Sequence, residues 1–212
     1  DGAKGQTLNT DATVQNITKF LQQESTSVVA TPAAVEPKVS YTRQYTHTSG
    51  GINALLSNYA KDHTGTYGVS FSEIGGQART AQYNGSKVFT TASTYKLFVA
   101  LGALTRVEKG TWQWSDQITD GRDLTKCFDD MIVKSDNACA EALLSKIGFK
   151  ALTDEIHAVG LNSSGFMGAN PQTTAQDLRT YLTKLELAQL PINSDSRSRL
   201  LDAMKRNIYR SG

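Results

Sequence analysis

The sequence is poor in the residues that build metal centres. Its 212 residues include two cysteines, Cys127 and Cys139, and three scattered histidines, His47, His63 and His157. The spacing of the cysteines matches no zinc or redox motif. We therefore expect no metal site and no cofactor. A disulfide formed in an oxidising compartment and two buried free thiols both fit the cysteines, and the sequence does not choose between them.

The sequence also lacks a charge excess and a long apolar run. Its formal net charge is +2, with basic and acidic residues interspersed, which predicts binding neither to nucleic acid nor to an anionic membrane. The longest apolar segment, from Tyr95 to Leu104, is much shorter than the roughly 20 residues that span a bilayer and indicates a buried helix. The first residue is Asp1 rather than Met, so we expect a processed or trimmed N-terminus.

The first 40 residues are predicted to form a tether or linker that contains one short helix. A segment of helical spacing carries four apolar side chains, at Val14, Ile17, Phe20 and Leu21. Residues 25–38 are rich in Ser, Thr, Ala, Val and Pro, a composition typical of extended tethers. Two interpretations stay open, namely a plain spacer and a stalk that joins the domain to a membrane anchor further upstream.

Residues 41–212 are predicted to form one domain in which a helix over 52–60 comes first, two strands follow, and the rest is helical. Apolar residues alternate with small polar ones along 66–74, and 78–83 reads as the returning strand. Helical patterns then cover 93–109, 124–134, 137–147, 151–159, 174–187 and 196–208. Because a two-stranded hairpin is not stable alone, the pattern predicts an α+β domain with a complete helical part and an incomplete antiparallel sheet.

The first candidate for chemistry is Ser93-Thr94-Tyr95-Lys96, which opens the most apolar helix. An i, i+3 spacing puts the Ser93 hydroxyl and the Lys96 amine on one helix face. A buried amine with a lowered pKa can accept the proton of a serine nucleophile, and a helix N-terminus favours a developing oxyanion. The competing interpretation of this short motif is a Ser N-cap beside an exposed lysine.

The second candidate is Ser135-Asp136-Asn137, at the junction of two predicted helices. All three residue types are preferred N-caps, so one of them is expected to cap the second helix. Three such residues are more than a cap requires. We expect Asp136 to hold the turn while Ser135 and Asn137 face a cleft.

Together the two motifs resemble those of class A β-lactamases and D-alanyl-D-alanine peptidases, the penicillin-recognising serine hydrolases. The surrounding residues are also similar to that family, from Thr91 to Gly110, around Met131 to Asn137, at Thr173–Ala175 and from Met204 to Gly212. The resemblance covers roughly residues 50–212. It implies the β-lactamase/transpeptidase fold.

The resemblance also implies a role for each residue of the two motifs. Ser93 would be the acylated nucleophile, and its backbone N–H would supply half of an oxyanion hole. Lys96 would act as general base or proton relay, and Ser135 would carry a proton to the leaving nitrogen. Asn137 would bind the acylamide side chain of the substrate.

Two features depart from the family pattern. The third motif, K-[ST]-G on a strand lining the cleft, is absent from these 212 residues, which leads us to expect a truncated chain that is inactive on its own. Class A β-lactamases also activate water with a Glu in a loop that corresponds to residues 161–172, where this chain has no acidic residue. Glu141 and Glu155 lie within predicted helices. We therefore expect the intact protein to be deficient in deacylation.

These observations predict a serine acyl-enzyme hydrolase that acts on β-lactams or peptidoglycan-type peptides. We expect it to be bacterial and extracytoplasmic, either secreted or membrane-tethered. Self-association through the open sheet edge is a further expectation. The alternatives are a non-catalytic binding or scaffold domain of the cell wall and a serine-dependent glutaminase.

Overall fold

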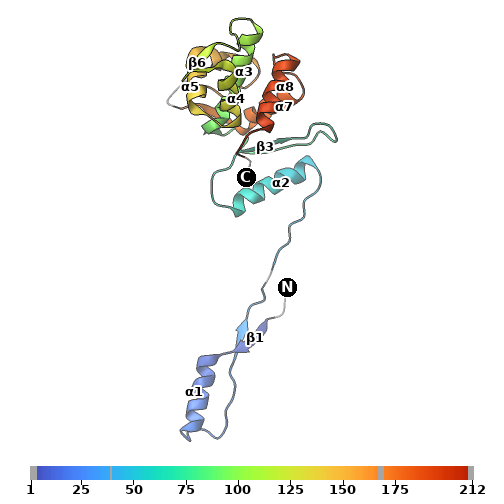
Figure 1. Ribbon diagram of the computed structural model, residues 1–212. Coiled ribbons are helices and arrows are strands. Elements are labelled where there is room, and N and C mark those ends of the chain that lie inside the picture. Colours follow the sequence, from blue (N-terminus) through green and yellow to red (C-terminus); the bar gives the residue numbers. More distant parts are fainter. Residues whose placement is uncertain (1–3, 39, 167–169, 210–212) are drawn as a thin grey trace. The chain divides into compact units, whose positions relative to one another are not determined.

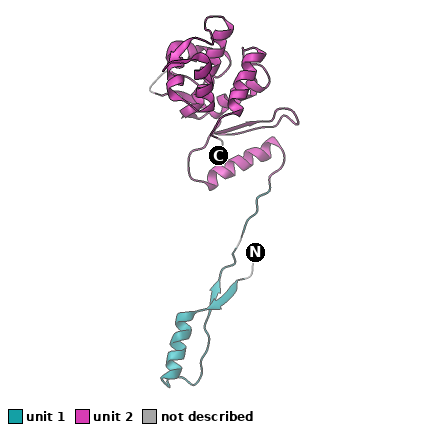
Figure 2. Ribbon diagram, in the orientation of Figure 1, with its two compact units in different colours: residues 1–44 teal, residues 45–212 magenta. Residues whose placement is uncertain are grey.

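The computed structural model describes residues 4–38, 40–166 and 170–209, and its chain forms two units. Figure 2 shows them as residues 1–44 and residues 45–212. The division thus falls after Gln44, whereas the composition places it after residue 40. In the described residues no helix is both long and apolar enough to cross a membrane.

The first unit contains the predicted helix and, in addition, a pair of strands. Strand β1 (Gly5–Leu8) pairs antiparallel with β2 (Pro32–Val35), and helix α1 (Thr10–Leu21) lies between them in sequence. Two side chains of α1 hold the returning chain: Asn16 donates to the Val29 carbonyl, and Thr13 accepts from the Thr31 N–H. The predicted extended tether is therefore partly a paired strand, because composition does not register these bonds between distant residues.

The second unit begins with a helix that packs on a hairpin. Helix α2 (Ser49–Asp62) contacts strand β4 (Thr80–Tyr83), which pairs antiparallel with β3 (Val69–Ser72). Figure 1 shows α2 and β3 together at one end of this unit. In the described residues each of these strands has one strand neighbour only, as the incomplete-sheet prediction requires.

The rest of the second unit is largely helical, as the sequence predicts. Its elements are β5 (Val88–Thr90), a 3₁₀ turn (Ala92–Thr94), α3 (Tyr95–Glu108), β6 (Gln117–Thr119), β7 (Arg122–Asp123), α4 (Leu124–Val133), α5 (Asn137–Ile147), α6 (Phe149–Ala158), β8 (Gln172–Thr174), α7 (Ala175–Glu186) and α8 (Ser194–Lys205). Gly110, Gly148 and Gly160 follow the ends of α3, α5 and α6, and all have positive φ angles, which glycine adopts without strain.

The sequence does not predict the short strands β6, β7 and β8. Strands β6 and β7 pair with each other, and β8 pairs antiparallel with β5, so that Thr90 lies opposite Gln172. Segments of two or three residues are too short for a period-two pattern, and the partner of β5 lies far along the chain. The β5–β8 pair holds the segment that leads into α3.

Helix α3 forms the centre of the core. Eight residues from Lys96 to Leu104 are buried, with α4 and α5 (Figure 1), and also α6, packed around them. Gly102 allows a close approach, since a Cβ there would lie 3.0 Å from side-chain carbons of Ile147 and Leu152. On the side of α7, the buried Tyr181 hydroxyl donates to the Leu97 carbonyl at 2.8 Å. These contacts fix the direction of α3, and with it the position of its first turn.

The two cysteines form a disulfide between α4 and α5. The bond between Cys127 and Cys139 means that the alternative of two free thiols is wrong. Both residues are fully buried. The bridge joins residues separated by 12 positions in sequence, and the loop that it closes contains residues 134–136. The link thus ties together the two helices on either side of that loop.

We expect the Cys127→Ala/Cys139→Ala variant to lose about 2–3 kcal/mol of unfolding free energy, because the unfolded chain regains the entropy that the short loop removes. Urea unfolding followed by circular dichroism measures the loss. In the wild-type protein, alkylation of the unfolded chain without reductant should add no mass. Alkylation of either thiol under those conditions would contradict the assignment.

Candidate functional site

The site begins at a strained turn ahead of α3. Ser93 lies in the 3₁₀ turn before the helix and is exposed, and Ala92 just before it has a φ of 45°. Thr91 fixes this turn on both sides: its N–H donates to the Pro171 carbonyl, and its own carbonyl accepts from the Thr94 hydroxyl at 2.6 Å. A left-handed non-glycine residue costs about 1–2 kcal/mol, so the turn is held in place by these surroundings.

Lys96 connects this turn with the Ser135-Asp136-Asn137 loop. Its Nζ lies 3.3 Å from the Ser93 Oγ, 2.9 Å from the Ser135 Oγ and 2.7 Å from the Asn137 Oδ1. It also donates to the Ser135 backbone carbonyl at 2.5 Å. The residue is only 2% exposed, so the predicted i, i+3 geometry holds and the alternative of an exposed lysine is wrong.

The loop between α4 and α5 has the arrangement that the sequence predicts. Asp136 caps α5, where its Oδ1 accepts from the Cys139 N–H at 2.8 Å. Ser135 has a φ of 55°, and Asn137 is the first residue of α5. Both side chains turn toward Lys96, while the Asp136 side chain forms the cap. All four residues predicted for the site therefore lie together, and their chemical roles stay predictions.

A cleft of about 810 Å³ lies over these residues. Its polar part consists of Ser93, Lys96, Ser135 and Asn137, and its apolar part includes Met131 and Met204. A space of this size accommodates a small ligand or a short peptide.

The end of the described chain also lies at this cleft. Asn207 donates to the Ile132 carbonyl at 2.7 Å, and the Ile208 N–H donates to the Val133 carbonyl at 3.0 Å. These bonds pin the segment after α8 to the end of α4, and the side chains of Asn207 and Tyr209 line the cleft. Only the resemblance around Met204–Gly212 pointed to this region, and residues 210–212 lie outside the described part.

The electrostatic surroundings of Lys96 favour release of its proton. Burial lowers the pKa of Lys96 below its usual value, while the carboxylates of Asp136 and Glu141 partly oppose that shift. Glu141 also adds to the rise in the pKa of the neighbouring Tyr95, which comes mainly from burial. From the sequence, Glu141 is expected within a helix and has no predicted role at the site. It lies one turn after Asn137 on α5, on the same helix face.

The contacts of Lys96 suit an amine that exchanges a proton with a hydroxyl. Two of its partners, the Ser135 carbonyl and the Asn137 Oδ1, can only accept, so they take up two N–H groups. The remaining position on the nitrogen faces the Ser93 and Ser135 hydroxyls. It carries an N–H in the ammonium form and the lone pair in the neutral form. When Lys96 is neutral, its lone pair can accept the proton of Ser93. Within the described residues the Asn137 NH₂ group has no acceptor, so it can donate to a carbonyl oxygen of a ligand.

The loop at 161–172 is held by polar contacts and offers no carboxylate to the cleft. Asp177 of α7 accepts from the Ser163 N–H and from the Ser164 hydroxyl, and the Phe166 ring packs edge-on against Tyr95. At the start of α7 a capping box is only half formed. The Thr174 side chain accepts from the Asp177 N–H, but the carboxylate of Asp177 binds the loop instead of returning to the cap. Residues 167–169 of this loop lie outside the described part.

Replacing Glu141 by Gln should lower the pKa of Lys96, because a negative charge that favours the ammonium form is removed. NMR titration of protein labelled with ¹³C-lysine measures this value, and the Lys96 signal is assigned by its loss in Lys96→Arg. Glu155→Gln is the matched control, since Glu155 pairs with Arg106 on another face of α3. An unchanged or raised pKa in Glu141→Gln would refute this electrostatic account.

Comparison with known proteins agrees with this geometry. Residues 51–212 match the model of the β-lactamase enzyme family. No curated protein sequence matches the chain.

Several solved structures share the fold. The protein PBP-A superposes with a TM-score of 0.68 at 19% identity, over 79% of this chain and 72% of its own. An ancestral class A β-lactamase of Gram-negative bacteria gives a TM-score of 0.66 at 24% identity, over 74% and 72%. A β-lactamase from Sphaerobacter thermophilus gives 0.65 at 20% identity, over 73% and 68%.

The α+β fold of this unit is thus the β-lactamase/transpeptidase fold, as the sequence motifs imply. Since the family model covers most of the chain, the protein belongs to the β-lactamase enzyme family.

Proposed function

We propose that the protein is a serine acyl-enzyme hydrolase that acts on β-lactams or on peptidoglycan-type peptides. One observation carries the proposal: the buried Lys96 amine lies within hydrogen-bonding distance of both the Ser93 and Ser135 hydroxyls. A nucleophile, a base with a lowered pKa and a second hydroxyl relay are the parts that acyl transfer to serine requires.

The proposed reaction proceeds in two stages. In acylation, Lys96 takes the Ser93 proton while the Ser93 Oγ attacks the amide carbonyl, and the oxyanion faces the backbone N–H of Ser93 at the start of α3. The C–N bond then breaks, the leaving nitrogen receives a proton through Ser135, and an ester is left on Ser93. In deacylation, water adds to that ester and the acid is released. Asn137 would hold the acylamide group of the substrate.

The second stage is proposed to be slow. A water molecule needs a base to attack an ester at a useful rate, and such a base usually contributes 10²–10⁴-fold. The residues from Leu161 to Gln172 contain no Asp or Glu. The acyl-enzyme would therefore persist, which suits a peptidase or a penicillin-binding protein better than an efficient β-lactamase.

The protein is further proposed to work outside the bacterial cytoplasm. The buried disulfide between α4 and α5 supports this location, because disulfides persist mainly in oxidising compartments. A cell-wall substrate lies in the same compartment.

We expect benzylpenicillin to add its mass to the full-length protein at Ser93 and not to Ser93→Ala. Lys96→Ala should slow the labelling by about 10²–10³-fold, because the base is lost. Intact-mass spectrometry and peptide mapping measure both results. Ser194→Ala, which removes an exposed serine at the start of α8, should label like the wild type.

The 212-residue chain, which has no K-[ST]-G motif among its residues, should take up little or no label. Label that survives in Ser93→Ala would refute the assignment of the nucleophile. Rapid turnover of a chromogenic cephalosporin would refute slow deacylation. A full-length protein that takes up no label would favour the non-catalytic scaffold.

Strand β3 is proposed to support self-association. It pairs with β4 on one edge, carries the exposed Phe71, and is followed by the exposed Ile74. An unpaired edge flanked by exposed apolar side chains is a template for another strand.

In Phe71→Lys, the added charge should shift the chain from dimer to monomer, and light scattering coupled to size-exclusion chromatography measures the mass. Val88→Lys, at an exposed position of strand β5, is the control and should leave the mass unchanged. A wild-type chain that is monomeric at high concentration would contradict the proposal.

A further inference from the structure

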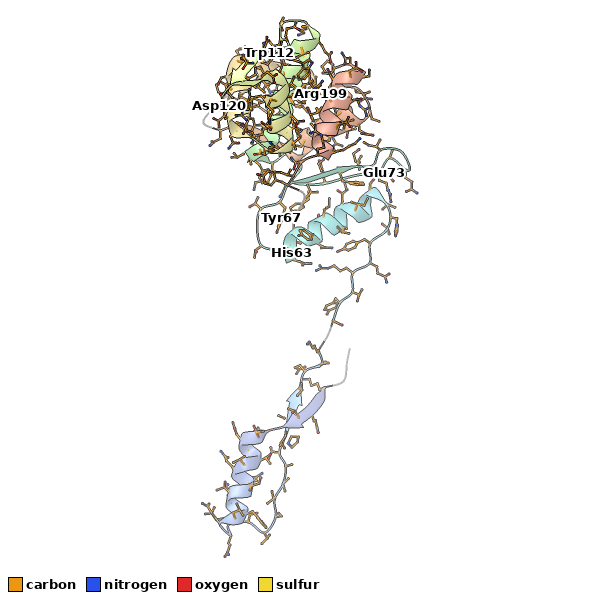
Figure 3. All side chains as sticks on the ribbon, viewed as in Figure 1. His63, Tyr67, Glu73, Trp112, Asp120 and Arg199 are labelled. Atoms are coloured by element: carbon orange, nitrogen blue, oxygen red, sulfur yellow. A yellow bond between two sulfur atoms is a disulfide. The ribbon has the colours of Figure 1, made fainter. Side chains whose placement is uncertain are left out.

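One arginine behind the site binds three carboxylates. The Arg122 guanidinium lies 3.1 Å from Asp120, 3.3 Å from Asp130 and 3.2 Å from Asp136. Arg122 is on β7, and Asp120 lies in the turn between β6 and β7 (Figure 3). Strand β6 in turn contacts α4 and α5. Arg122 itself reaches α4 through Asp130 and the N-cap of α5 through Asp136.

Of these carboxylates, only Asp136 depends on Arg122. Asp130 is 4% exposed and is also paired with Lys126 at 2.5 Å and Lys134 at 3.0 Å. Burial alone would raise the pKa of Asp130, yet the hydrogen bonds from its basic neighbours bring it to about 2. Asp120 is largely exposed to water. For Asp136, by contrast, Arg122 is the only basic side chain paired with it in the described part of the chain.

Asp136 in turn determines the position of both neighbours that contact Lys96. Its Oδ1 caps α5, its Oδ2 binds Arg122, and its backbone N–H donates to the Asp130 carbonyl at 3.1 Å. The residues on either side of it, Ser135 and Asn137, carry the atoms that surround the lysine amine. A shift of Asp136 would therefore move both of them.

The charge of Asp136 also matters for the chemistry of Lys96. The negative charge of Asp136 favours the protonated form of the Lys96 amine, and that form cannot act as a base. The guanidinium of Arg122 places a positive charge directly on that carboxylate. The hydrogen bond from Arg122 contributes to the lowered pKa of Asp136, after the bond from the Cys139 N–H.

We propose that Arg122 is a positioning residue of this site: it clamps Asp136 from behind and offsets its charge, so that Lys96 can lose its proton. The contribution to acyl transfer rests on the proposed function. The effect on the protonation of Lys96 does not, because it follows from charges and distances within the chain.

Other groups near Lys96 bear on its protonation. Helix α3 contributes Tyr95, α5 contributes Glu141, and the loop before α5 contributes Asp136. On α4, Asp130 is neutralised by its own two lysines. From the described segment after α8, the uncharged Asn207 and the phenol Tyr209 reach the cleft. In the described part of the chain Arg122 is the basic residue paired with Asp136, so removing Arg122 leaves Asp136 without an ion-pair partner.

The test is the NMR titration of Lys96 in the 212-residue chain labelled with ¹³C-lysine. Arg122→Met should raise the midpoint by about 0.5–1 pH unit, because the negative charge of Asp136 is then no longer offset and favours the ammonium form of Lys96. Arg122→Lys keeps the charge and should leave the midpoint near that of the wild type. Adding Asp136→Asn to Arg122→Met removes the carboxylate that has lost its ion-pair partner, and it should reverse the rise in the Lys96 midpoint.

Arg106→Met is the matched control. Arg106 is similarly buried and pairs with Glu155, so its loss should lower the unfolding temperature without moving the Lys96 midpoint. If Arg122→Met does not fold, Arg122→Gln replaces it. A midpoint that stays at the wild-type value in a folded, uncharged variant would overturn the inference.

The same set of variants separates this inference from the proposed function. The labelling of Ser93 by benzylpenicillin in the full-length protein tests the function, and the Lys96 midpoint tests the role of Arg122. A shifted Lys96 midpoint without labelling of Ser93 would refute the proposed function and support the role of Arg122. Labelling of Ser93 with an unshifted midpoint would support the function and refute the role of Arg122.

Discussion

The arrangement of the second unit depends on one buried amine. Lys96 joins the first turn of the central helix to the loop between α4 and α5, and it bonds to main chain and side chains alike. A charged group as deeply buried as this one is costly unless its partners satisfy it, and the partners here are two carbonyl-type oxygens and two hydroxyls. Whatever holds those partners in place therefore also controls whether the amine is charged.

Backbone strain is concentrated around the same lysine. The two non-glycine residues with left-handed backbone at the site are Ala92, beside the nucleophilic serine, and Ser135, beside the cap of α5. Strained residues persist where their surroundings over-determine them. Here the surroundings are the β5–β8 pair for Ala92, and the cap, the ion pairs and the disulfide for Ser135.

The helices and the four site residues could be predicted from the sequence, because both rest on local information. Apolar periodicity and glycine stops give α3 to α8 to within a few residues, and the i, i+3 spacing puts Ser93 beside Lys96. The partners of short strands, the pairing of the cysteines and the position of Tyr209 depend on contacts between distant segments. Arg122 escaped notice for the same reason, since nothing near it in sequence marks it as a partner of Asp136. Glu141 was named only as a helical residue, although its i, i+4 spacing from Asn137 already placed it on the face of α5 that carries the site.

The disulfide has a consequence for cleavage of the backbone. Any peptide bond broken between residues 127 and 139 lies inside the covalent ring that the bridge closes. A protease that nicks the exposed Lys134 would therefore leave both fragments joined through sulfur, and they would migrate as one species until reductant is added. Helices α4 and α5 would stay paired, and the core around them would outlast the cut in the loop.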